Sequence, residues 1–132
     1  GENCIIGDGV SIGTHSVVEH DVIIEGGVRV HSGAFIPEHS VLKSGCWIGP
    51  NAVLTNAKYP LSKNSKLNLK GPTIGENAII GANATIMPGV KIGKGSLVAS
   101  AAVVTKDVTE GSVVAGVPAR KVKSKSDILE YG

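Results

Sequence analysis

Branched aliphatic residues recur at every sixth position along most of the chain, and this spacing dominates its pattern of hydrophobic and polar residues. An α-helix repeats about every 3.6 residues and a simple strand about every 2, so neither produces this period. The members are Ile6, Ile12, Val18, Ile24, Val30, Ile36, Leu42, Ile48 and Leu54 and, after one interruption, Ile74, Ile80, Ile86, Ile92, Val98 and Val104. We predict that all of these side chains are buried in short strands of a six-residue repeat.

Small side chains follow the aliphatic residues at a second fixed distance of four positions, as at Ala34, Ala52 and Ala78. Glycine often comes directly after the aliphatic residue, as at Gly7 and Gly49. A short strand followed by a tight turn explains both positions, because glycine accepts the backbone conformations that tight turns need. The pattern therefore predicts an all-β chain whose aliphatic layers stack into one continuous core.

Two segments carry a resemblance to a known family. IIGDGVSIG, from residue 5, and TIGENAIIGANATIMPGVKIGKGSLV, from residue 73, resemble the hexapeptide repeat of left-handed parallel β-helix proteins. In that family three repeats of six residues form one triangular coil of eighteen. The resemblance covers almost the whole chain, and it implies a left-handed parallel β-helix with one extruded loop and a short C-terminal tail.

The repeat sets the domain organisation. We expect one β-helix domain over 1–132, with coils over 1–54 and 74–109, a loop over 55–73 and a C-terminal tail over 110–132. The loop has four lysines, no acidic residue and no six-residue period, and a long loop inside a compact repeat is typical of a functional site. The chain opens at Gly1 in mid-repeat, so a missing N-terminal part is one interpretation.

Composition narrows the class of protein further. The 132 residues include 18 glycines but only one Trp, one Phe and two Tyr, so the core must be aliphatic. A net charge of +2 does not favour nucleic acid as a partner, and no apolar run approaches the ~20 residues that cross a membrane. Cys4 and Cys46 fall on inward positions too far apart for a disulfide. We therefore expect free core thiols in a reducing compartment, the cytoplasm.

The coil length predicts which polar residues meet. Residues eighteen apart stack in neighbouring coils at about 4.8 Å, the spacing of adjacent strands. His20, Glu38 and Asn56 therefore form one corner column, from which the loop departs, and Asp21 and His39 form the column beside it. Exposed corners attract polar residues without any function, but the departing loop favours a site. We predict that His20, His39 and Asn56 are catalytic and that Asp21 and Glu38 position the substrate.

The C-terminal half carries a more specific resemblance. LVASAAVVTKDVTEGSVVAGVPARKV, from residue 97, resembles the last coils of acetyl-CoA-dependent hexapeptide acyltransferases, with alanines in place of two glycines. That resemblance implies acetyl-CoA as co-substrate. The residues that it implies are Gly81, Ala99, Ala101 and Lys106 along the CoA groove, with Gly116, Arg120 and Lys121 near the nucleotide phosphates. Lysine and arginine suit this position because they bind phosphate charge.

Two other segments resemble different subfamilies. IGPNAVLTNAKYPLS, from residue 48, is similar to acyltransferases that modify amino groups on nucleotide-linked sugars, which implies a role for Asn56. Galactoside and maltose O-acetyltransferases carry their basic histidine before a proline, where this chain has Tyr59, here assigned to substrate positioning. VVEHDVII, from residue 17, is similar to acetyltransferases of the sialic-acid and bacillosamine pathways, whose base corresponds to His20, followed by the acid Asp21.

The chemistry of acetyl transfer favours an amine as the acceptor. A hydroxyl needs a base within hydrogen-bond reach, whereas a sugar amine is intrinsically nucleophilic and gains much of its rate from positioning. We therefore predict an acetyl-CoA-dependent transferase that N-acetylates an amino sugar, with a nucleotide-linked sugar among the candidates. The alternatives are a sugar O-acetyltransferase and a non-catalytic domain that only trimerises.

An outward apolar column predicts self-association, because an exposed apolar surface favours a partner. The column consists of Val17, Phe35, Val53 and Val103, with Thr85 among them. Together with the resemblance, it predicts a homotrimer with sites between subunits. A γ-type carbonic anhydrase uses the same coil, but it needs three zinc histidines, and only His15 and His20 have a suitable spacing. We therefore expect no metal.

Overall fold

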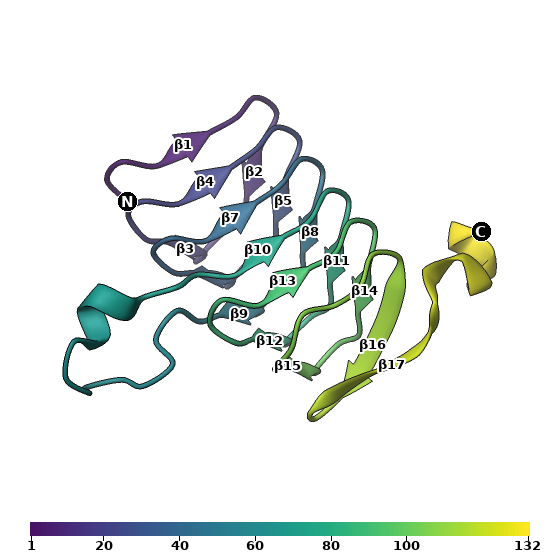
Figure 1. Ribbon diagram of the computed structural model, residues 1–132. Helices are drawn as coiled ribbons and strands as arrows, with labels where there is room; N and C mark the ends of the chain where they lie inside the picture. The colour runs from purple at the N-terminus through teal and green to yellow at the C-terminus, as the bar shows by residue number, and fades with distance from the viewer.

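The computed structural model describes residues 1–132 and winds short strands into a parallel β-solenoid of about six coils (Figure 1). The strands form three sheets, one on each side of the solenoid. The first sheet contains β1 (Ile5–Ile6), β4 (Ile23–Ile24), β7 (Val41–Leu42), β10 (Thr73–Ile74) and β13 (Lys91–Ile92). The second contains β2 (Ser11–Ile12), β5 (Arg29–Val30), β8 (Trp47–Ile48), β11 (Ile79–Ile80), β14 (Leu97–Val98), β16 (Ser112–Gly116) and β17 (Ala119–Ser124). The third contains β3 (Val17–Val18), β6 (Phe35–Ile36), β9 (Val53–Leu54), β12 (Thr85–Ile86) and β15 (Val103–Val104).

The register between strands follows the coil length read from the sequence. Ile6 pairs with Ile24 and Val30 pairs with Ile48, each eighteen residues apart. Every aliphatic repeat position from Ile24 to Leu54 and from Ile74 to Val104 is at most 2% exposed. Stacked aliphatic layers therefore form the core, and the β-helix fold predicted from the repeat is confirmed.

The first coil departs from the predicted burial. Ile6 is 50% exposed and Ile12 is 42% exposed, while Val18 is half-buried. Each inner coil is covered by a coil on either side, but β1, β2 and β3 each have only one strand neighbour. The prediction that the repeat residues are buried is therefore wrong for Ile6 and Ile12, since a periodic sequence does not mark the end of a stack.

The extruded loop interrupts the repeat in the middle of the chain, and the tail follows its last coil. The loop leaves after β9, contains the 3-10 turn η1 (Ser65–Asn68) and returns at β10. Lys70 N–H donates to the Asn56 carbonyl at 2.9 Å, which closes the base of the loop. The tail forms an antiparallel hairpin of β16 and β17 and ends in η2 (Lys125–Asp127) and η3 (Leu129–Tyr131). The sequence predicted a tail there without its hairpin.

Both cysteines are free, as the sequence predicted. Cys46 is fully buried in the core, and burial raises the pKa of its thiol to about 12. Cys4 is half-buried, and its Sγ donates to the Glu19 carbonyl at 3.0 Å. Because the thiolate is the nucleophilic form, Cys46 acts as a small core residue rather than a reactive group.

Candidate active site

His20 lies between two carboxylates at the corner that joins β3 to β4. Its Nδ1 lies 2.6 Å from Oδ2 of Asp21, and its Nε2 lies 3.4 Å from Oε2 of Glu38. Asp21 adopts a left-handed backbone conformation at φ 55°, as the sharp corner requires, and a short polar side chain tolerates it. The ring is 48% exposed and is therefore open to a ligand while both carboxylates hold its orientation.

The electrostatic surroundings raise the pKa of His20 above its ordinary value of 6.5. The hydrogen bond that His20 donates to Asp21 is the largest cause, and the negative charges of Glu38, Asp21 and Glu19 add to it, while desolvation acts in the opposite direction. Both carboxylates favour the imidazolium form over the neutral ring. His20 therefore sits where a proton taken from a ligand is stabilised near neutral pH.

Asn56 completes the column that the coil length predicted. Its Nδ2 donates to the Glu38 carbonyl at 3.2 Å, one coil away from the contact between Glu38 and His20. His39 lies beside this column, and its backbone N–H donates to the Asp21 carbonyl at 3.1 Å. Its side chain is exposed and makes no hydrogen bond or ion pair, so the geometry separates His20 from His39. The structure thus brings His20, Asp21, Glu38 and Asn56 together.

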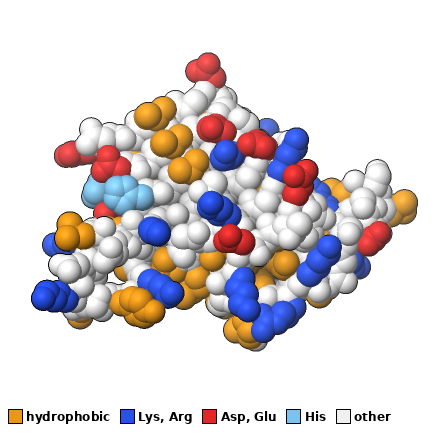
Figure 2. Space-filling view, viewed as in Figure 1, with side chains coloured by type: hydrophobic (Ala, Val, Ile, Leu, Met, Phe, Trp, Pro, Cys, Tyr) orange, Lys and Arg blue, Asp and Glu red, His pale blue; other side chains and the backbone are white.

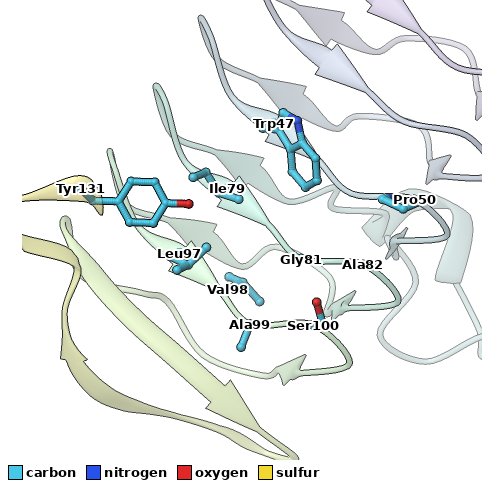
Figure 3. Close-up of a pocket in the computed structure, with 10 residues that line it drawn as sticks. All are labelled: Trp47, Pro50, Ile79, Gly81, Ala82, Leu97, Val98, Ala99, Ser100 and Tyr131. Atoms are coloured by element: carbon cyan, nitrogen blue, oxygen red, sulfur yellow. The ribbon is translucent and has the colours of Figure 1, made fainter. Parts of the chain in front are cut away.

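An apolar groove runs along the outer face of the second sheet (Figure 3). It encloses about 670 Å³, and Tyr131 from the C-terminal segment faces the strands across it. The lining residues are Trp47, Pro50, Ile79, Gly81, Ala82, Leu97, Val98, Ala99, Ser100 and Tyr131. Two of the residues expected to line the CoA groove, Gly81 and Ala99, are among them. The groove suits an extended ligand with apolar segments.

A second, basic hollow of about 290 Å³ lies between the last coil and the hairpin. Lys106, Arg120 and Lys121 line it, together with Asp107 as the one acidic residue. These three cations were all expected to contact CoA, and the fold brings them together from a corner and from β17. Three cations against one carboxylate make this hollow attractive to phosphate.

Two of the expected cofactor residues, Ala101 and Gly116, lie outside both hollows, and a third, Gly81, has a structural reason to be glycine. Ala101 adopts φ 63° at an exposed corner, and Gly116 adopts φ 95° at the end of β16, and neither lines a hollow. An added Cβ at Gly81 would lie 2.5 Å from the Ser100 nitrogen, so coil stacking alone requires glycine there. The glycine at 81 therefore reflects coil stacking and not ligand binding alone.

The aromatic and aliphatic walls of the groove were not predicted from the sequence. Trp47, Ile79 and Leu97 stack in register on β8, β11 and β14, at the outward position of each strand. The coil-length spacing that predicted the outward apolar column on the third sheet also predicts this column when it is applied to the second sheet. Tyr131 carried no such signal, because the tail lies outside the repeat.

Comparison with protein families and curated proteins supports the resemblance. The family "Bacterial transferase hexapeptide (six repeats)" matches residues 71–106. A 2,3,4,5-tetrahydropyridine-2,6-dicarboxylate N-acetyltransferase from Staphylococcus aureus (strain JH9) is 41% identical over 83 residues, which cover 63% of this chain and 32% of that protein. The chain thus spans about a third of the length of the curated relatives that it matches. Residues 71–106 thus match the hexapeptide repeat that the sequence predicted.

Solved structures share the fold over most of the chain. A variant of perosamine N-acetyltransferase from Caulobacter crescentus, in complex with CoA and GDP-perosamine, has a TM-score of 0.81 at 25% identity and covers 94% of this chain and 52% of that one. The acetyltransferase domain of PglB from Neisseria gonorrhoeae FA1090, in complex with acetyl coenzyme A, has a TM-score of 0.80 at 26% identity, with 92% and 53% covered. Both match this chain over more than nine tenths of its length.

No helix is long and apolar enough to span a bilayer. No group of three or more His, Cys, Asp or Glu side chains within the chain is arranged to hold a metal ion.

Proposed function

We propose that this chain is an acetyl-CoA-dependent N-acetyltransferase whose acceptor is an amino sugar, including a nucleotide-linked one. The observation that carries the proposal is His20, exposed at a corner with Nδ1 held by Asp21 and Nε2 facing Glu38. The CoA and sugar complexes of the similar proteins support the same class of reaction. An O-acetyltransferase is the second candidate, since a histidine base also serves a hydroxyl.

The residues of the chain fit the co-substrate. The apolar groove beside Gly81 and Ala99 offers a surface for the pantetheine arm, and the hollow at Lys106, Arg120 and Lys121 offers cations for phosphates. Ala101 and Gly116 line neither hollow, and we propose them only as backbone contacts of the bound cofactor. When bound, acetyl-CoA supplies a thioester carbonyl carbon that the amine attacks as the C–S bond breaks and the thiol leaves.

Each polar residue of the corner has a part in handling the amine. His20 takes the proton that the amine loses on forming the amide bond, and it does so at Nε2 because Asp21 fixes Nδ1–H. Glu38 lies on the Nε2 side and attracts an ammonium group before the transfer. Asn56 and Tyr59 position the sugar, and His39 is the alternative base in the neighbouring column. Pro88 and Lys106 continue the corner column toward the basic hollow, about four strand spacings or ~19 Å from His20.

We place these sites between subunits of a homotrimer. The outward column on the third sheet supports this arrangement, since Val17 and Val53 are 46% and 38% exposed and stand in register with Phe35. A corner of one subunit would then face the coils of its neighbour, so that the acceptor site and the groove meet. The free thiols Cys4 and Cys46 support a reducing, cytoplasmic setting.

The pH dependence of acetyl transfer tests the base. Protonated His20 accepts no proton, so the rate should fall as pH drops through a pKa above 6.5. Asp21→Asn replaces the charged acceptor of this hydrogen bond with a neutral one and removes the negative charge of Asp21, but it keeps an oxygen that accepts the Nδ1–H bond. We expect the acidic limb of the pH–rate profile, measured between about pH 5 and pH 9 with an amino-sugar acceptor, to move to lower pH in this variant.

The matched control is Glu25→Gln, which removes a corner carboxylate that contacts Ser44 rather than His20. Its profile should coincide with that of the unmodified protein. An unmoved acidic limb in Asp21→Asn would remove His20 from the base role, and an unmodified protein without any transfer activity would reject the proposed function itself.

A further inference from the structure

The extruded loop concentrates positive charge. Its four lysines at 58, 63, 66 and 70 face no acid within the segment 55–73, so it carries +4. The rest of the chain has nine Lys and Arg against eleven Asp and Glu, since 13 − 4 = 9, and is therefore net −2. None of the loop lysines is among the ion pairs, which join His20 to Asp21 and Glu38, and Lys43 to Glu76. The loop is a cationic element on a weakly acidic solenoid.

Only two of the four lysines line a hollow. A cavity of about 290 Å³ lies at the base of the loop, bounded by Lys58, Tyr59, Asn68, Lys70 and Pro88. The Lys58 ammonium lies 5.4 Å from the centre of the Tyr59 ring, within the range of a cation–π contact. Lys63 and Lys66 lie elsewhere on the loop and contribute nothing to this cavity. Its volume is several times the ~30 Å³ of a water molecule, enough for a phosphate group.

The hollow is connected to the histidine cluster by a continuous series of contacts. His20 Nε2 meets Glu38, the Asn56 amide donates to the Glu38 carbonyl, and Lys70 N–H donates to the Asn56 carbonyl. From His20 to the level of Asn56 is two strand spacings, roughly 10 Å. Pro88, which lines the hollow, lies one further spacing along the same column, roughly 14 Å from the level of His20. A sugar that carries a phosphate or a diphosphate covers this span together with the reach of a lysine side chain.

The two ends carry opposite charge. Carboxylates surround His20, while lysines occupy the loop, and Figure 2 shows the histidine patch with acidic side chains above it and lysines below it on the loop side. A ligand with an amino group at one end and an anion at the other matches this arrangement. A neutral sugar satisfies only the acidic end.

We infer that Lys58 and Lys70 form a phosphate subsite for the acceptor, which is an amino sugar that carries a phosphate or a diphosphate. This inference rests on the proposed function and deepens it, because it selects phosphorylated or nucleotide-linked amino sugars over free ones. The lysines act as point charges on the phosphate, Tyr59 supports Lys58, and the amine of the same ligand faces His20.

The test compares two double variants with the same change of charge on the same loop. In Lys58→Gln/Lys70→Gln the hollow loses both cations, whereas in the control Lys63→Gln/Lys66→Gln the loop loses two cations outside it. Calorimetry measures binding of inorganic pyrophosphate with saturating CoA present, so that the cofactor's own phosphate sites are filled. We expect the hollow variant to bind about tenfold more weakly than the unmodified protein and the control to stay within about twofold.

A kinetic arm uses an amino-hexose 1-phosphate and its methyl glycoside as acceptors. The ratio of their kcat/KM values should fall about tenfold in the hollow variant and hold in the control. Equal effects of both variants would mean diffuse attraction and overturn the subsite, as would pyrophosphate that competes with CoA. If the unmodified protein acetylates neither sugar, the proposed function fails, while the binding arm still decides whether the hollow is an anion site.

Discussion

Replacement of His20 by alanine should lower kcat for acetyl transfer to an amino sugar by at least ~10²-fold, within the ~10²–10⁴-fold range of a general base. The reason is local, because no other imidazole is held by two carboxylates as His20 is by Asp21 and Glu38. CoA affinity and thermal stability should hold, since the ring is exposed and contributes nothing to the core. Steady-state kinetics with thiol detection measures the loss.

His39→Ala and His15→Ala are the matched controls. Both residues are exposed, both adopt a left-handed backbone conformation at a corner as Asp21 does, and neither side chain contacts a carboxylate. Their turnover should stay within about threefold of the unmodified protein. A large loss of turnover in His39→Ala with a small loss in His20→Ala would assign the base role to His39. Small losses in both variants would contradict a histidine base in this corner.

Reversing two charges at the basic hollow should weaken CoA binding by roughly 100-fold at low salt. In Arg120→Glu/Lys121→Glu, two of the three cations around the hollow become repulsive to phosphate. At about 1.5 kcal/mol each, the lower end for hydrogen bonds to charged groups, the loss of the two contacts gives this factor. The difference should shrink as salt rises, because both side chains are exposed and screened. Equilibrium binding of CoA at several salt concentrations checks both expectations.

The control for this pair is Lys94→Glu/Lys123→Glu, which makes the same change of net charge on the same end of the solenoid. Neither lysine lines the basic hollow, and Lys123 lies on the same hairpin strand as Arg120. An equal loss of CoA affinity in the control and test variants would show that the overall charge of the protein, and not the hollow, causes the effect. Unchanged CoA affinity in Arg120→Glu/Lys121→Glu would reject this location for the phosphates.

The core and the histidine corner could be predicted because every coil of a regular solenoid contains the same number of residues. Once the aliphatic period set the coil length, the meeting of His20, Glu38 and Asn56 followed from subtraction, and the register and the contacts agree with it. The same spacing predicts that Ile24 pairs with Leu42 in neighbouring strands, without any use of strand propensities. In a repeat fold, non-local contacts are encoded as sequence separations.

Structural features outside the six-residue repeat could not be predicted from residue spacing. The hairpin of β16 and β17 and the placement of Tyr131 over the groove depend on how the tail folds back, which no spacing records. Lys58 and Lys70 line the hollow and the other two loop lysines do not, and this difference depends on the path of the loop. The exposure of Ile6 and Ile12 depends on which coil is terminal, and a repeat looks the same there as inside.

The linkage of the transferred acetyl group tests the central claim most directly. The unmodified protein would be incubated with acetyl-CoA and either an amino sugar or the same sugar with a hydroxyl in place of the amine, each as its phosphate. NMR and mass spectrometry of the products distinguish an amide from an ester. We expect one acetyl group per molecule on the nitrogen of the amino sugar and no product from the hydroxyl counterpart. An ester on either sugar, or no acetylated product from the amine, would contradict the central claim.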